Sequence, residues 1–127
     1  RTHSPSPMGS AETSLLGWFE EYALPVADLA RAQAEWERLG FVPAEEGEEP
    51  YPHIGLTSDS LNVALVAPGT IRQPALLFLE EDMSARIAKL AEAGFEFERR
   101  LPRGLDPSRH ALLVAPEGTQ LLLARAP

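Results

Sequence analysis

The sequence predicts an α+β fold of two tandem βαβββ modules, whose curved mixed sheets form a cup-shaped cavity. The prediction depends on a pattern that occurs twice: an extended segment, an aspartate that can cap a helix, an amphipathic stretch, and a glycine followed by phenylalanine. Three further extended segments follow each amphipathic stretch. Repeats of this length are typical of duplicated supersecondary units. The matched positions, each pair separated by 54 residues, are Asp28 and Asp82, Gly40 and Gly94, and Phe41 and Phe95.

The first module is predicted over about residues 15–68. An extended stretch at 20–26 leads to Asp28, which is suited to cap a helix that ends at Gly40. Further extended segments are expected at 41–47, 51–57 and 61–67. The apolar face of the helix consists of Leu29, Ala32, Trp36 and Leu39.

The second module is predicted over about residues 74–126 and repeats this order. A buried strand at 74–79 precedes Asp82 as the second cap, and Gly94 ends the helix. Extended segments follow at 95–101, 109–115 and 119–125. The apolar helix face consists of Met83, Ile87, Leu90 and Ala91.

The 127 residues suit one domain over 15–127, with residues 1–14 as a flexible tail because they are small, polar and proline-containing. A natural start at Met8 would make residues 1–7 foreign to the protein. Cysteine is absent, which excludes disulfides and thiolate metal sites. The net charge of −8 argues against nucleic acid as a partner, and no apolar run is long enough to span a membrane. A cytoplasmic protein is expected.

Two segments, Leu24–Phe41 and Leu112–Leu123, carry a resemblance to a known family. The first reads strand, Asp-Leu, helix, Leu-Gly-Phe, and the second contains Pro-Glu-Gly in a hairpin. The sequence in this way resembles the vicinal oxygen chelate superfamily of glyoxalases, extradiol dioxygenases, methylmalonyl-CoA epimerases and bleomycin-resistance proteins. The resemblance covers about residues 18–125. It implies a scaffold that serves both metal-dependent chemistry and the sequestration of drugs.

The resemblance also implies where a metal would bind, on the first and last strand of each module. The corresponding residues are Glu21, Ala64, Ala75 and Leu122. Alanine and leucine offer no lone pair, whereas a divalent metal generally needs at least three protein donors. We therefore expect no metal at these positions, no cofactor and no catalytic residue of the superfamily type.

Strand alternation predicts which polar side chains face the cup and bind a ligand. Each has an alternative role: the histidines as structural residues, Glu21 as a solvated carboxylate, and the two amides as partners of nearby turns. The predicted ligand-binding residues are Glu21, His53, Asn62, His110 and Gln120.

Charged residues form an acidic run in the first module and a basic run in the second. Both suit solvated loops. Alternatively, the basic run receives an anionic ligand or meets the acidic run of a second chain in the homodimer that we expect. The acidic run consists of Glu45, Glu46, Glu48 and Glu49, and the basic run of Arg99, Arg100, Arg103 and Arg109.

Three functions follow from these residues. The first is a metal-free protein of the bleomycin-resistance type, which sequesters a small, partly aromatic compound in the cup. The second is a metal-dependent lyase, isomerase or dioxygenase with a rearranged metal site of Glu21, His53 and His110. The third is an accessory domain with a vestigial cup. The missing donors at three of the four superfamily positions favour the first.

Overall fold

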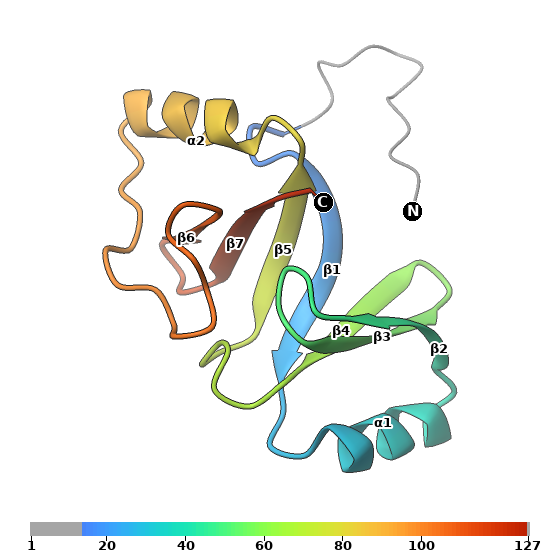
Figure 1. Cartoon of the computed structure of the whole chain (residues 1–127). Coiled ribbons are helices and arrows are strands. Elements are labelled where there is room, and N and C mark those ends of the chain that lie inside the picture. Colours follow the sequence, from blue (N-terminus) through green and yellow to red (C-terminus); the bar gives the residue numbers. More distant parts are fainter. Residues whose placement is uncertain (1–13, 127) are drawn as a thin grey trace.

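The computed structural model describes residues 14–126, so the predicted tail lies outside the described residues except for Ser14. Seven strands and two helices follow one another in the order expected for two βαβββ modules, except that the second module lacks the strand after its helix (Figure 1). The elements are β1 (Trp18–Pro25), α1 (Leu29–Arg38), β2 (Val42–Gly47), β3 (His53–Ser58), β4 (Leu61–Val66), β5 (Ala75–Glu80), α2 (Met83–Glu92), β6 (His110–Val114) and β7 (Gln120–Arg125).

All seven strands belong to one curved sheet with the order β2-β3-β4-β1-β5-β7-β6. In each module the first strand pairs in parallel with the last, β1 with β4 and β5 with β7. The modules join where β1 and β5 run antiparallel, with Ala23 opposite Ala75. Figure 1 shows α1 beside the first-module strands and α2 at the opposite end of the molecule. The predicted fold class is confirmed.

The two helices begin differently, although both follow an aspartate. The Asp28 carboxylate accepts a hydrogen bond from the Arg31 backbone N–H at 3.1 Å, as an N-cap should. Asp82 makes no capping bond and instead pairs with the Arg86 Nε at 2.8 Å. The prediction of a side-chain cap is therefore confirmed for Asp28 and wrong for Asp82. Both helices are followed by a glycine with positive φ, Gly40 at 108° and Gly94 at 99°.

One predicted strand, at 95–101, does not form. Its backbone makes a single bond toward β6, from the Glu98 N–H to the Leu112 carbonyl at 2.8 Å. The segment carries four charges in five residues, from Glu96 to Arg100, and Pro102 has no N–H to extend a ladder. The second module consequently lacks the strand that corresponds to β2.

The core has three parts, two under the helices and one on the opposite, concave face of the sheet. Where α1 packs on the sheet, the rings of Trp36 and Phe41 meet edge to face, with their centroids 4.9 Å apart. Where α2 packs on the sheet, its residues Met83 and Leu90 are buried. On the concave face, Tyr51 lies in a cluster that crosses the module boundary. That cluster consists of Ala23, Tyr51, Val66, Ile71, Ala75, Leu77, Leu79, Leu105, Leu112, Leu122 and Ala124. Neither described helix has the length and apolarity needed to cross a membrane.

Candidate functional site

The four positions implied by the resemblance all lie on the concave face and are buried. Glu21 is on β1, Ala64 on β4, Ala75 on β5 and Leu122 on β7. Only Glu21 carries a donor atom, so these residues do not fit a metal ion bound in the superfamily manner.

The cup is not one open cavity, because the concave cluster fills its centre. Tyr51 is 1% exposed there, and Ile71 and Leu105 lie in the same cluster. A hollow remains on each side. The first-module pocket encloses about 160 Å³ and is lined by Glu20, Glu21, Ala44, Glu45, Gly55, Leu56, Asn62 and Val63. The second-module pocket encloses about 190 Å³ and is lined by Ile71, Arg72, Gln73, Ala75, Glu98, Arg100, Pro102, Leu105, Leu112, Val114, Gln120 and Leu122.

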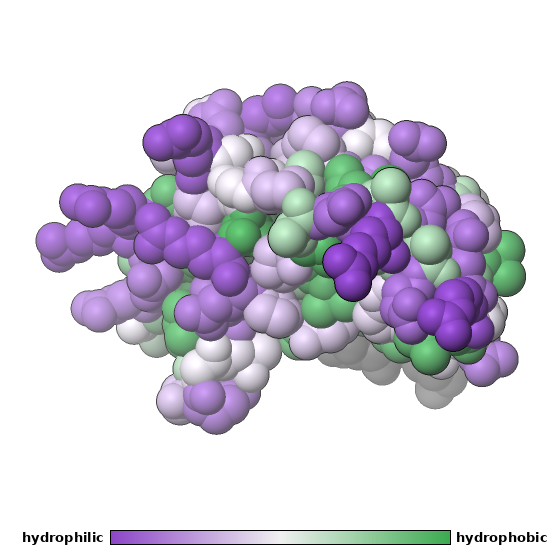
Figure 2. Space-filling view, turned by 90° about the horizontal axis from the view of Figure 1, so that it is seen from below, coloured by the Kyte–Doolittle hydropathy of each residue, from purple (hydrophilic) through white to green (hydrophobic). Residues whose placement is uncertain are grey.

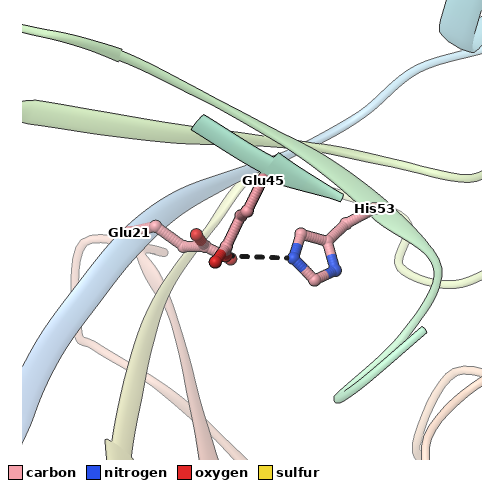
Figure 3. Close-up of side chains that lie close together, drawn as sticks. All are labelled: Glu21, Glu45 and His53. Atoms are coloured by element: carbon pink, nitrogen blue, oxygen red, sulfur yellow. Dashed lines mark hydrogen bonds and ion pairs between the residues drawn. The ribbon is translucent and has the colours of Figure 1, made fainter. Parts of the chain in front are cut away.

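Three ionisable side chains converge beside the first-module pocket (Figure 3). Glu21 of β1, Glu45 of β2 and His53 of β3 each offer a donor atom within 4.8 Å of the other two. The His53 Nε2 lies 3.4 Å from the Glu45 Oε2. Glu21 and His53 are buried at 4% and 6% exposure, whereas Glu45 is exposed. In residues 14–126 this is the only group of three such side chains with metal-ligand spacing.

A backbone contact determines the orientation of the His53 ring. Its Nδ1 lies 2.8 Å from the Tyr51 carbonyl oxygen. A carbonyl only accepts, so Nδ1 carries the hydrogen and donates it. In the neutral ring the Nε2 lone pair then points toward the carboxylates.

Two irregularities in the sheet bring the carboxylates to this face. The register of β1 shifts between Phe19 and Glu21, and that of β2 between Pro43 and Glu45. Before its shift, β1 places Phe19 against Phe78 in the cluster under α2. After it, Glu21 lies opposite Leu77 of the concave cluster. A bulge reverses the side-chain alternation and re-aims the residue that follows it.

Tyr51 and Asn62 complete the surroundings of this pocket. Burial, together with the negative charges of Glu21 and Glu20, raises the pKa of the Tyr51 phenol, so the hydroxyl keeps its proton. The Tyr51 hydroxyl is buried and no described atom bonds to it. The Asn62 amide oxygen accepts from the Thr57 hydroxyl at 2.9 Å. Asn62 therefore faces the cup as predicted and also has the local partner of the alternative role.

The second-module pocket is apolar at its base and charged at its rim. Ala75, Leu112 and Leu122, from three neighbouring strands, are at most 9% exposed. Gln120 lines this pocket as predicted, and its amide lies 3.5 Å from the Gly118 carbonyl oxygen. Two arginines and one glutamate also line the pocket, Arg72, Arg100 and Glu98.

His110 is separate from both pockets and from the Glu21–Glu45–His53 cluster. The Asp106 backbone N–H donates to its Nδ1 at 2.8 Å, which requires an unprotonated Nδ1. Burial lowers the pKa of His110, and the positive charge of Arg109 acts in the same direction. The expected metal set of Glu21, His53 and His110 is therefore wrong in its third member, because β6 lies at the far edge of the sheet from β3.

Sequence reasoning assigned Glu45 to a solvated acidic run and missed it as a site residue. A bulge changes which face a residue occupies, and strict alternation cannot show this.

The acidic run and the basic run meet within one chain, where the Arg109 guanidinium pairs with the Glu49 carboxylate at 2.9 Å. Arg100 of the basic run lines the second-module pocket.

Comparison with known proteins gives the fold. No family model and no curated protein matches the sequence. A glyoxalase/bleomycin resistance protein/dioxygenase superfamily member from Vibrio splendidus matches with a TM-score of 0.54 at 16% identity, covering 84% of this chain and 97% of that one. The chain has the fold of this superfamily.

Two further similar structures carry functional names. A genomically encoded fosfomycin resistance protein from Listeria monocytogenes has a TM-score of 0.35 and 13% identity, covering 85% of this chain and 90% of that one. A lactoylglutathione lyase from Agrobacterium tumefaciens has a TM-score of 0.33 and 15% identity, covering 82% and 90%.

Proposed function

We propose that the chain is a small-molecule-binding protein of the bleomycin-resistance type, which sequesters a partly aromatic compound in the second-module pocket. One observation carries the proposal. Three neighbouring strands present an apolar base, Ala75, Leu112 and Leu122, beneath a rim that holds Gln120 and Arg100. Ligand sites typically combine such an apolar base with a few polar groups that orient the ligand. This binding requires no metal ion.

The size and charge of the pocket narrow the ligand class. Its volume of about 190 Å³ is small beside the ~300–1,000 Å³ of most ligand sites, so it suits one ring rather than a large drug. Arg72 and Arg100 outnumber the single carboxylate of Glu98 at the rim. A guanidinium pairs with carboxylates and stacks on rings. An aromatic carboxylate therefore matches the pocket.

Substituted benzoates, titrated into ¹⁵N-labelled protein, test this proposal. We expect amide shifts to concentrate on the pocket residues, such as Ala75 and Gln120. Loss of one polar partner costs ~1–3 kcal/mol, so Arg100→Ala and Gln120→Ala should each weaken binding about 5- to 150-fold. Arg99→Ala, the adjacent arginine that does not line this pocket, is the matched control. Shifts confined to the first module, or equal affinities in all variants, would contradict the proposal.

A metal-dependent lyase, isomerase or dioxygenase remains the second candidate function. The observation that favours it is the cluster of Glu21, Glu45 and His53 with metal-ligand spacing. Such an enzyme would use donors from three strands of one module, of which only Glu21 occupies a superfamily position. Measured turnover that requires an added metal ion and is lost in His53→Gln would favour it over sequestration.

We also propose that the chain forms a homodimer. Strands β2 and β6 end the sheet, and an open strand edge offers backbone groups to a partner. The face in Figure 2 shows hydrophobic side chains only in patches between hydrophilic ones. Light scattering should return twice the chain mass of 13.9 kDa, and a monomer at micromolar concentration would contradict the proposal.

A further inference from the structure

We propose that Glu21, Glu45 and His53 form a binding site for a first-row divalent cation such as Zn²⁺, beside the first-module pocket. The site goes beyond the ligand binding proposed above and uses a different hollow. It also differs from the arrangement implied by the resemblance, because Glu45 and His53 lie on the second and third strands of the module.

The donor set and its spacing suit such an ion. Zn²⁺ binds imidazole nitrogen at ~2.0–2.1 Å and carboxylate oxygen at ~2.0–2.2 Å, so two ligands in a tetrahedral site are about 3.3–3.6 Å apart. The His53 Nε2 and the Glu45 Oε2 are separated by 3.4 Å. The remaining spacings are at most 4.8 Å, and the Glu45 side chain, 53% exposed, has room to adjust.

The His53 ring is held as metal-ligating histidines usually are. Such ligands donate their second ring N–H to a carbonyl or carboxylate, which fixes the tautomer. The Tyr51 carbonyl accepts the Nδ1 hydrogen at 2.8 Å. In the neutral ring, the Nε2 lone pair and the Glu45 carboxylate then face each other, and a cation between them, either a proton on Nε2 or a metal ion, makes this contact favourable.

Gly55 gives independent support for the proposed site, because its lack of a side chain leaves room for Glu45. It lies directly opposite Glu45 in the β2–β3 pair. A Cβ at Gly55 would be 2.9 Å from the Glu45 Cγ, so the absence of a side chain lets Glu45 lie across the sheet. Together with the two bulges, this glycine directs both carboxylates toward one buried imidazole.

Three protein donors leave at least one coordination position for water or another oxygen ligand. The first-module pocket of about 160 Å³ contains Glu21 and Glu45 in its wall. The open position therefore suits a small ligand that binds through oxygen.

Calorimetric titration of the full chain with ZnCl₂ alone tests the site. We expect one Zn²⁺ per chain, bound at low micromolar concentration or tighter. His53→Gln, Glu45→Gln and Glu21→Gln should each weaken binding by at least about tenfold. Gly55→Ala should weaken it as well, although it changes no charge. Visible absorption of the Co²⁺ form should show a tetrahedral spectrum that His53→Gln abolishes.

Matched controls separate this site from diffuse attraction to acidic residues. Glu46→Gln removes the same charge one residue along β2, opposite Ile54 and on the other face, and should bind Zn²⁺ like the unmodified chain. His3→Gln and His110→Gln should also leave binding unchanged. If Glu21→Gln fails to fold because Glu21 is buried, Glu45→Gln and Gly55→Ala still decide the matter.

Three results would overturn the proposal. They are no Zn²⁺ binding at micromolar concentration, equal affinity in Glu45→Gln and in Glu46→Gln, and NMR signals of the His53 ring that titrate with pH but do not respond to Zn²⁺. The last result would mean that a proton alone joins His53 and Glu45.

Discussion

The two modules repeat one chain path, yet their hollows differ in chemistry. In the first, Glu21 and Glu45 converge on His53, whereas in the second, Ala75, Leu112 and Leu122 form an apolar base. The first module has a complete edge strand, β2, which supplies Glu45; the matching segment at 95–101 is not a strand and supplies Arg100 to a pocket rim. A duplicated backbone therefore determines where hollows form, and single strands and bulges determine what lines them.

The largest expected effect tests the apolar half of this comparison. Leu122 is 0% exposed and packs in the concave cluster. Leu122→Ala should lower the free energy of unfolding by ~2–5 kcal/mol, because it removes buried contacts and leaves a cavity. Urea denaturation measures the change. Leu61→Ala, at a position 42% exposed on β4, is the control and should change stability much less. If both variants lost a similar free energy of unfolding, the base of the second-module pocket would not be part of the hydrophobic core.

Two glycines, one beside each pocket, sharpen the comparison. A Cβ at Gly104 would be 2.9 Å from the Thr70 Cγ2 and 3.2 Å from its Cα, and that backbone cannot move aside easily. Gly104→Ala should cost ~1–3 kcal/mol. At Gly55 the close contact, 2.9 Å, is with the Glu45 Cγ, and the Glu45 backbone oxygen at 3.5 Å is at ordinary contact distance, so the stability of Gly55→Ala should stay close to that of the unmodified chain. Thermal denaturation ranks the two, and a reversed order would show that Glu45 is held rigidly.

His110 of the second module should make the stability of the chain depend on pH. Its pKa is lowered in the folded chain, so the unfolded chain binds the proton more readily. The stabilisation is present above pH ~6.5 and is lost as the pH falls through the lowered value, by at most ~1.4 kcal/mol per pH unit. We expect the free energy of unfolding, measured from pH 7.5 to 5, to fall less steeply in His110→Gln than in the unmodified chain. An unchanged slope would assign the decline to other groups.

The smallest expected effect compares the helix starts. Asp28→Ala removes a capping bond and should cost ~1 kcal/mol. Asp82→Ala removes only a pair with Arg86 four residues later, which is worth ~0.3–0.5 kcal/mol. Denaturation of both variants in parallel measures the difference. Equal losses would mean that Asp82 also caps α2 in solution.

Local pattern was sufficient for most of the fold. Helical spacing and the Gly-Phe stops placed α1 and α2, and alternation placed Leu122 and Gln120 on the concave face. It failed at 95–101, where the residues resemble a strand but the backbone finds one partner. Whether a strand forms depends on pairing along a neighbouring strand, and here the segment meets the open edge of β6 through the single bond of Glu98.

For the candidate sites, the sequence by itself determined that Ala64, Ala75 and Leu122 offer no metal donor, because donor atoms are a property of residue type. It also identified Glu21 and His53 as cup-facing. Only the tertiary structure placed Glu45 beside them and His110 at the other end of the sheet. The physical reason is that bulges and strand order act between segments: a one-residue shift in pairing reverses the face of every residue that follows, and no local pattern records it.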